Sequence, residues 1–253
     1  MTLVLLHSAG ATPEIWDRVR GFLAGIPVIA PALPGRADAG EPADDVAVHG
    51  AAVLRLLDRE EITRAAIAGH SLGGAVALWL TINHPARVAG LGVLNAGGRM
   101  RVAPQMLEAL PDGLEPIVDM VALSNFSPGS PDEWIDERRA AYRAVGGATL
   151  LADLTACDRF DVLDRLWEIR CRTQVLAGSE DALTPARHAR LMSERISAAR
   201  YVEYTGAGHM LPIERAREVA GELAVLWAST LDGPIRGREA PAPGRAGSLP
   251  RVG

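Results

Sequence analysis

The stretch Gly69-His70-Ser71-Leu72-Gly73 constrains the possible folds of this chain more than any other part of the sequence. The apolar run "RAAIAG" before it predicts a buried strand, and "GAVALWLTINH" after it predicts a helix that is apolar on nearly every face. A turn that leads directly from strand to helix holds its central residue in a strained backbone, and side chains two positions away would collide. Because glycines occupy both of those positions, the pattern predicts that Ser71 is a nucleophile raised above the edge of a sheet. The alternative is a glycine-rich helix entry with a serine of no special role.

Apolar runs alternate with helical stretches along most of the chain. Residues 43–60 and 215–231 carry apolar side chains at helical spacing. Strands are expected at "TLVLLHS", "PVIAPALPG", "RAAIAG", "VAGLGVLNAG", "RTQVLAG" and "ARYVEYT". Strands that are apolar throughout and are separated by helices indicate a parallel sheet with both faces covered. The sequence therefore predicts an α/β fold with a mostly parallel sheet of about six strands flanked by helices.

Two segments depart from this alternation. The interval between Asn95 and Arg172 is long and helical throughout, which indicates either a cap over the edge of the sheet or an extra subdomain. From residue 232 to residue 253 the chain is rich in Pro, Gly and Arg and has no apolar periodicity, so this tail is expected to be disordered.

Composition excludes several classes of function. The net charge of −5 gives no reason to expect a nucleic-acid partner, and the absence of lysine excludes a Schiff base or a lysine-containing phosphate loop. Cys157 and Cys171 lack the spacing of a zinc or redox motif, and no metal site is expected. The N-terminal apolar run has no basic region before it and is too short for a signal peptide or a membrane span. A cytoplasmic protein with no membrane association is therefore expected.

A serine nucleophile needs a histidine base and a carboxylate that orients the base. His209 is the best base of the six histidines, because it follows the last strand in a loop of small residues, at the sheet edge where such sites form. Asp181 follows the fifth strand and is the predicted acid, with Glu180 as its competitor. The loop after the fourth strand offers only Asn95 in that role, which strengthens the choice of Asp181.

The oxyanion that forms during acyl transfer needs two N–H donors. One is predicted to be the backbone N–H of Leu72, the residue after the nucleophile. The other is expected in the loop after the first strand, with Ala9 favoured and Ser8 or Gly10 as alternatives.

The stretch "FDVLDRLWEIRCRTQVLAG" is similar to the esterase-like and enol-lactonase-like branch of the α/β-hydrolase superfamily. Five segments, in this order, resemble the superfamily as a whole over about residues 3–231. They are "LLHSAG", "VIAPALPG", "GHSLGG", "LAGSEDALTP" and "GAGHMLPIERAREVA". Two positions depart from the usual pattern: Ser8 stands where the family has glycine, and Ala32 stands where it has an acidic residue.

The resemblance implies a division of the chain into a core and a cap. Residues 1–99 and 162–231 would form the α/β-hydrolase core, and residues 100–161 would form a helical cap over it. The inner face of the cap would select the substrate through apolar side chains, for which the candidates are Met106, Met120, Leu123, Phe126 and Trp134.

The predicted activity is hydrolysis of a small-molecule carboxylic ester or lactone through an acyl-enzyme intermediate, with no cofactor. Ser71 would attack the carbonyl carbon, His209 would transfer the proton, and Asp181 would orient His209. The same three residues would also suit a cofactor-free haloperoxidase, a C–C bond hydrolase or a thioesterase, and a ligand-binding protein without activity is a further alternative. The natural substrate and the oligomeric state do not follow from the sequence.

Overall fold

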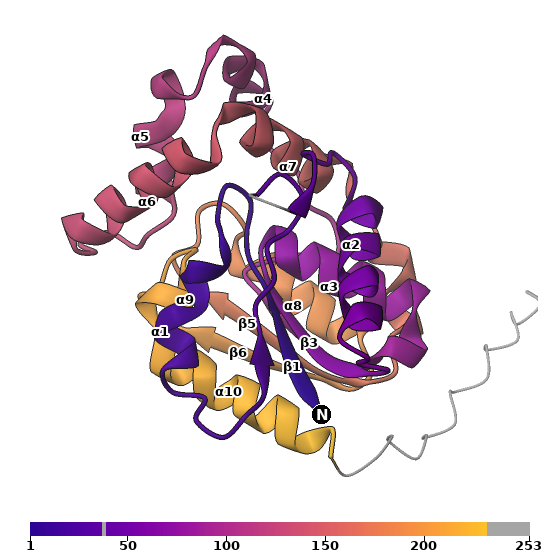
Figure 1. Cartoon of the computed structure of the whole chain (residues 1–253). Helices are drawn as coiled ribbons and strands as arrows, with labels where there is room; N and C mark the ends of the chain where they lie inside the picture. The colour runs from indigo at the N-terminus through magenta and orange to yellow at the C-terminus, as the bar shows by residue number, and fades with distance from the viewer. Residues whose placement is uncertain (37–38, 232–253) are drawn as a thin grey trace, which may run out of the picture.

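A single six-stranded sheet, with all strands parallel, forms the centre of the molecule (Figure 1). The structure is a computed structural model that describes residues 1–36 and 39–231. The strand order is β2-β1-β3-β4-β5-β6. The strands are β1 (Thr2–Leu6), β2 (Val28–Ile29), β3 (Ala65–His70), β4 (Val88–Leu94), β5 (Arg172–Gly178) and β6 (Ala199–Tyr204). The predicted parallel sheet of about six strands flanked by helices is confirmed.

The handedness of the crossovers decides which face each helix covers. Helix α3 (Leu72–Asn83) connects β3 to β4, and helix α8 (Ala186–Arg195) connects β5 to β6. Both connections step across the sheet in the same direction, so these two helices cover the same face. Helix α2 (Val46–Arg59) packs on α3, while α1 (Asp17–Arg20) and α10 (Ala216–Ser229) pack together on the opposite face (Figure 1). Helix α3 is apolar almost all round because it lies between the sheet and α2.

Two elements are shorter than the sequence pattern predicts. Strand β2 covers only Val28–Ile29 at the edge of the sheet, because prolines at positions 27, 31 and 34 have no N–H for a hydrogen-bond ladder. Helix α2 begins at Val46, three residues later than the apolar spacing predicts, because the Asp45 side chain caps it by accepting a hydrogen bond of 2.8 Å from the N–H of Ala47.

The remaining elements of the core are short. The 3-10 helices are η1 (Pro13–Trp16), η3 (Pro85–Arg87) and η5 (Leu163–Glu168), and helix α9 (Leu211–Glu214) precedes α10. Residues 232–253, for which disorder is predicted, lie outside the described residues, and the cytoplasmic location stays a prediction.

Residues 100–161, called the inserted segment from here on, lie over the carboxyl ends of the strands (Figure 1). Their elements are α4 (Pro104–Ala109), η4 (Leu110–Asp112), α5 (Glu115–Ser124), α6 (Asp132–Val145) and α7 (Gly147–Arg159). The two ends of the segment run antiparallel: the N–H of Met100 donates to the carbonyl of Phe160 at 3.2 Å, and the N–H of Val162 donates to that of Gly98 at 2.7 Å. The segment therefore leaves the core and returns to it at one place.

His7 joins the end of β1 to the loop after β2. Its Nδ1–H donates to the carbonyl of Ser8 at 3.0 Å, and its Nε2 accepts from the N–H of Leu33 at 3.0 Å, so the ring is neutral. Burial, with a further contribution from the charge of Arg36, lowers the pKa of His7 from 6.5 to about 3. This histidine is thus a structural link between two loops.

Acidification is expected to destabilise the fold through His7. In the unfolded chain His7 binds a proton as the pH falls through 6.5, while the folded chain does not bind it until the pH reaches about 3, so stability falls across this window. Each pKa unit corresponds to about 1.4 kcal/mol, so the loss amounts to several kcal/mol. The amide of the variant His7→Asn can also donate and accept. The variant's free energy of unfolding in urea, measured above pH 6.5 and between pH 6.5 and about 3, should fall less than that of the wild type. An equal pH dependence in both proteins would contradict this role of His7.

Candidate active site

Ser71 lies at the turn from β3 to α3 and has an unusual backbone, with φ 54° and ψ −114°. This region is costly for a residue with a side chain and persists only where the surroundings enforce it. A Cβ on Gly69 would overlap the backbone of Gly73, and a Cβ on Gly73 would overlap the carbonyl of Leu6. Both glycines are therefore required by the close approach of the backbone, as the sequence pattern predicts.

His209 and Asp181 form a buried pair. The Nδ1 of His209 lies 2.8 Å from Oδ2 of Asp181, and both side chains are at most 5% exposed. The other carboxylate oxygen, Oδ1, accepts from the N–H groups of Leu183 and Thr184 at 2.9 and 2.8 Å. Oδ2 also accepts from Nδ2 of Asn95 at 2.7 Å and from the hydroxyl of Thr184 at 2.7 Å. Because Nδ1 donates to Asp181, the Nε2 atom of His209 is the one left to accept a proton.

These contacts keep Asp181 ionised. Burial alone would raise its pKa, but the charge of His209 and the hydrogen bonds from His209 and Thr184 outweigh burial and lower the pKa to about 2. Glu180, the competing candidate, has an exposed side chain. A buried carboxylate that stays ionised can orient the ring of His209 through Nδ1.

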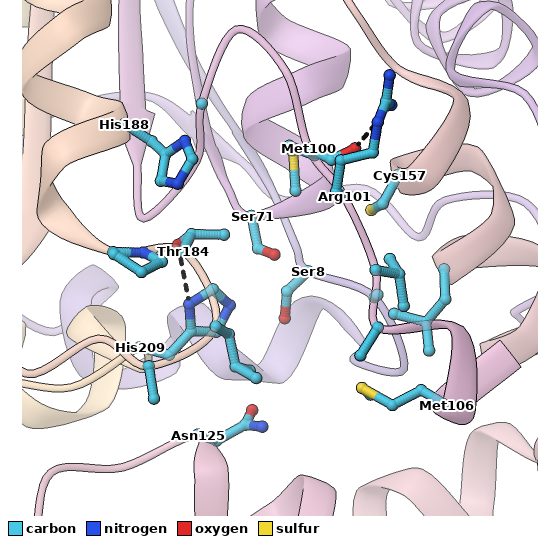
Figure 2. Close-up of a pocket in the computed structure, with 18 of the residues that line it drawn as sticks. Ser8, Ser71, Met100, Arg101, Met106, Asn125, Cys157, Thr184, His188 and His209 are labelled. Atoms are coloured by element: carbon cyan, nitrogen blue, oxygen red, sulfur yellow. Dashed lines mark hydrogen bonds between the residues drawn. The ribbon is translucent and has the colours of Figure 1, made fainter.

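Ser71 and His209 line the same cavity, which has a volume of about 610 Å³. Figure 2 shows both side chains facing its interior from opposite elements, the β3–α3 turn and the loop after β6. Within residues 1–36 and 39–231, the Ser71 hydroxyl makes no hydrogen bond. Catalytic hydrogen bonds in enzymes are often long or poorly aligned until substrate binds.

The loop that carries His209 is held by residues that sequence reasoning did not single out for the site. The carbonyl of Asn125, at the end of α5, accepts from the N–H groups of both His209 and Met210 at 3.0 Å. Nε2 of His70 donates to the carbonyl of His209 at 2.7 Å, and burial, together with the charge of His209, holds the pKa of His70 well below its usual value. Only the fold brings these residues to the loop, so no local sequence signal marks them.

The two predicted oxyanion donors are the backbone N–H groups of Leu72 and Ala9. Leu72 is the first residue of α3, and neither N–H donates to any residue in the described ranges. The N–H of Gly10 donates to Oδ2 of Asp153 at 2.8 Å, so this alternative donor is occupied. Ser8 adds a buried hydroxyl that has no partner among the described residues and that lies at the cavity beside Ser71 (Figure 2).

Two buried charged residues from the inserted segment hold this loop. Arg138 of α6 donates to the carbonyls of Ala9 and Gly10 at 2.8 and 3.0 Å. Asp153 of α7 accepts from the N–H of Gly10 and forms a buried ion pair with Arg36, with Nη1 of Arg36 at 2.8 Å from Oδ1. The position of the Ala9–Gly10 backbone thus depends on the inserted segment.

Of the five apolar side chains expected at the cavity, the structure places Met106 in its wall. The other four do not line it, which corrects the prediction. Met120 and Leu123 are 51% and 52% exposed, and the rings of Phe126 and Trp134 pack against each other with centroids 6.0 Å apart.

The helical period of α5 explains why Met120 and Leu123 do not line the cavity. Val121 and Asn125, one turn apart, face the cavity, and the positions of Met120 and Leu123 fall on the outer side of the helix. Because the register of α5 against the core is set by tertiary packing, the sequence does not reveal which face points inward.

In residues 1–36 and 39–231, no group of three or more His, Cys, Asp or Glu side chains is arranged to hold a metal ion. In the same ranges, no helix has both the length and the apolar character needed to cross a bilayer.

A strained serine turn after the third strand, with its acid and histidine on later loops, is the arrangement of α/β hydrolases. The alpha/beta hydrolase family model matches residues 3–222, and the chain belongs to this family. The predicted family resemblance is confirmed.

Individual relatives have several activities. The chain is 30% identical over 238 residues to the dihydrolipoyllysine-residue acetyltransferase component of the acetoin cleaving system of Pseudomonas putida, a match that spans 86% of this chain but only 60% of that protein. It is 29% identical over 231 residues to a pimeloyl-[acyl-carrier protein] methyl ester esterase of Aromatoleum aromaticum, over 82% of this chain and 90% of the relative. The crystal structure of the enol-lactonase from Burkholderia xenovorans LB400 has a TM-score of 0.83 at 21% identity and covers 92% of both chains, which shows a shared fold.

Replacing Asp153 by leucine is expected to destabilise the protein strongly. The change leaves the Arg36 guanidinium buried without its carboxylate, and breaking such a pair costs about 3–5 kcal/mol. Urea unfolding of Asp153→Leu would measure this loss. The matched control is Asp44→Asn, which breaks the exposed Arg159–Asp44 pair and should change stability little. Equal losses of stability in the two variants would show that the buried Arg36–Asp153 pair contributes no more than the exposed Arg159–Asp44 pair.

Proposed function

We propose that this protein is a serine hydrolase that cleaves a carboxylic ester or lactone of a small molecule through an acyl-enzyme intermediate. The observation that carries the proposal is the position of Ser71 on a strained turn, at a cavity that it shares with a histidine bonded to a buried, ionised aspartate. An unactivated serine is a poor nucleophile, so a base that is itself oriented by a carboxylate supplies what the chemistry needs.

The first half of the reaction forms the acyl-enzyme. Nε2 of His209 takes the proton from the Ser71 hydroxyl as Oγ attacks the carbonyl carbon, and Asp181 stabilises the imidazolium that results. The carbonyl oxygen becomes an oxyanion and accepts hydrogen bonds from the N–H groups of Leu72 and Ala9. When the tetrahedral intermediate collapses, His209 gives the proton to the leaving alkoxide. The alcohol of an ester then departs, whereas the hydroxyl released from a lactone stays attached to the acyl chain.

The second half releases the acid. Water takes the place of the alcohol, His209 removes its proton, and the hydroxide attacks the acyl carbon. The same two N–H groups stabilise the second oxyanion, and Ser71 leaves with the proton held by His209. The enzyme returns to its starting state, and no cofactor takes part in either half.

The inserted segment is proposed to act as the cap that shapes the substrate site. Its contributions to the cavity include Met106, Val121 and Leu150, and its residues Arg138 and Asp153 hold the loop that carries the Ala9 donor. A cap that positions an oxyanion donor would couple substrate enclosure to catalysis.

The relatives support acyl chemistry. The name of the Aromatoleum aromaticum protein specifies hydrolysis of a methyl ester, and that of the Pseudomonas putida protein specifies acetyl transfer. Both reactions transfer an acyl group to a new acceptor. Ser71 would accept such an acyl group here.

Substitutions of Ser71 and of Asp181 test the proposal. Ser71→Ala should abolish hydrolysis of p-nitrophenyl butyrate and labelling by a fluorophosphonate, because both need the hydroxyl. Asp181→Asn should lower kcat by about 10⁴-fold, since an amide stabilises the wrong tautomer of His209. Steady-state kinetics and gel-based labelling are the measurements.

The control is Ser193→Ala, a change in α8 at a serine that does not line the cavity. It should leave both activities unchanged. Undiminished hydrolysis by Ser71→Ala would refute the proposal, and a wild-type protein that binds small molecules but neither labels nor hydrolyses would indicate a binding protein with this fold.

A further inference from the structure

The wall of the cavity that contains Ser71 is one-sided in charge. Of the described residues that line it, four are arginines and two are histidines, and none is Asp or Glu. The arginines are Arg99, Arg101, Arg138 and Arg187. The whole chain contains 31 acidic residues and 26 arginines, so the cavity wall is more basic than the chain as a whole.

Two of the arginines, Arg99 and Arg101, share a single carboxylate. Nε of Arg99 lies 2.6 Å from Oδ2 of Asp161, and Nη2 of Arg101 lies 3.8 Å from the same oxygen. Asp161 sits where the inserted segment returns to the core, outside the cavity wall. One carboxylate shared by two guanidinium groups leaves a surplus of positive charge at this side.

Arg138 carries a buried charge that no carboxylate offsets. Its side chain is 3% exposed, and it donates to three neutral acceptors, which are the carbonyls of Ala9 and Gly10 and Oδ1 of Asn125. The guanidinium also lies 4.0 Å from the centroid of the Tyr142 ring. No carboxylate of the described residues is within ion-pair distance of it. Since a buried charge is weakly screened, Arg138 contributes a positive charge at the cavity wall, while the ionised Asp181 lies behind His209.

Arg187 leaves its donors open. It is an exposed residue near the start of α8, and it forms neither an ion pair nor a hydrogen bond with any residue in the described ranges. Its neighbour His188 has a pKa lowered by burial and by the charge of Arg187, so it stays neutral near pH 7. Three residues further along α8, Arg190 lies outside the cavity and pairs with Glu203 at 2.9 Å.

We infer that the substrate carries an ionised carboxylate in addition to the ester or lactone bond, and that Arg187 is the residue that binds this carboxylate. The inference rests on the proposed hydrolase function. An open guanidinium binds a carboxylate through two parallel N–H···O bonds, and the charge of Arg138 deeper in the cavity adds attraction without direct contact. Apolar wall residues, among them Met106, Val121 and Leu154, suit a hydrocarbon chain between the two polar ends.

Two esters of equal chain length test the inference. Mono-p-nitrophenyl adipate carries a terminal carboxylate, and p-nitrophenyl hexanoate ends in a methyl group. The wild-type protein should show the higher kcat/KM for the adipate ester, and this preference should decline as salt is added, because screening weakens the attraction. Arg187→Gln should lower the preference by roughly three- to fivefold through KM, the size expected for one partly exposed ion pair.

Arg190→Gln is the matched control, with the same charge change on the same helix, and it should keep the wild-type preference. A wild-type protein that hydrolyses the hexanoate ester equally well or better would overturn the inference while leaving the proposed hydrolase intact. A preference that survives unchanged in Arg187→Gln would overturn the assignment of Arg187. Hydrolysis of neither ester, with no fluorophosphonate labelling, would instead refute the proposed function and the inference with it.

Discussion

The parallel alignment of the strands is the constraint on which the rest of this structure depends. All strands end at one edge, so residues that follow β3, β4, β5 and β6 meet there although they are far apart in the sequence. The hydrogen-bond ladder continues past the strands into these loops. The N–H of Ser71 donates to the carbonyl of Leu94 at 2.9 Å, and that of Asn95 donates to the carbonyl of Leu176 at 2.9 Å. The sheet therefore holds the backbone of Ser71 through the same kind of hydrogen bond that joins its strands.

A second layer of organisation comes from buried polar groups that connect the core to the inserted segment. Arg138 and Asp153 hold the Ala9–Gly10 backbone, and Asn125 holds the backbone of His209. Such groups are stable when buried only if their hydrogen bonds are satisfied, so each contact specifies one arrangement of the two parts. The loop of Ala9 and Gly10 and the loop of His209 consequently both depend on the inserted segment, which also contributes to the cavity wall.

Features that depend on local backbone geometry could be predicted from the sequence, because they require particular residue types at neighbouring positions. The Ser71 turn needs glycines at 69 and 73, and the buried strands need unbroken apolar runs, so both are visible in the printed sequence. The choice of Asp181 over Glu180 also followed from its place further into the loop, and the structure pairs Asp181 with His209. Reasoning failed for Met120 and Leu123, since an apolar residue on an amphipathic helix can face either a cavity or solvent.

By itself, the sequence determined the α/β class, the order of strands and helices and the identity of the turn at Ser71, because each follows from spacing between near neighbours. Only the tertiary structure decided which polar side chains have partners: Arg138 donates to three acceptors, whereas the guanidinium of Arg187 and the hydroxyl of Ser8 have none among the described residues. These environments depend on segments separated by many residues, and no local pattern encodes them. They arise when the inserted segment packs over the sheet, and its packing is set by the sum of many small apolar contacts.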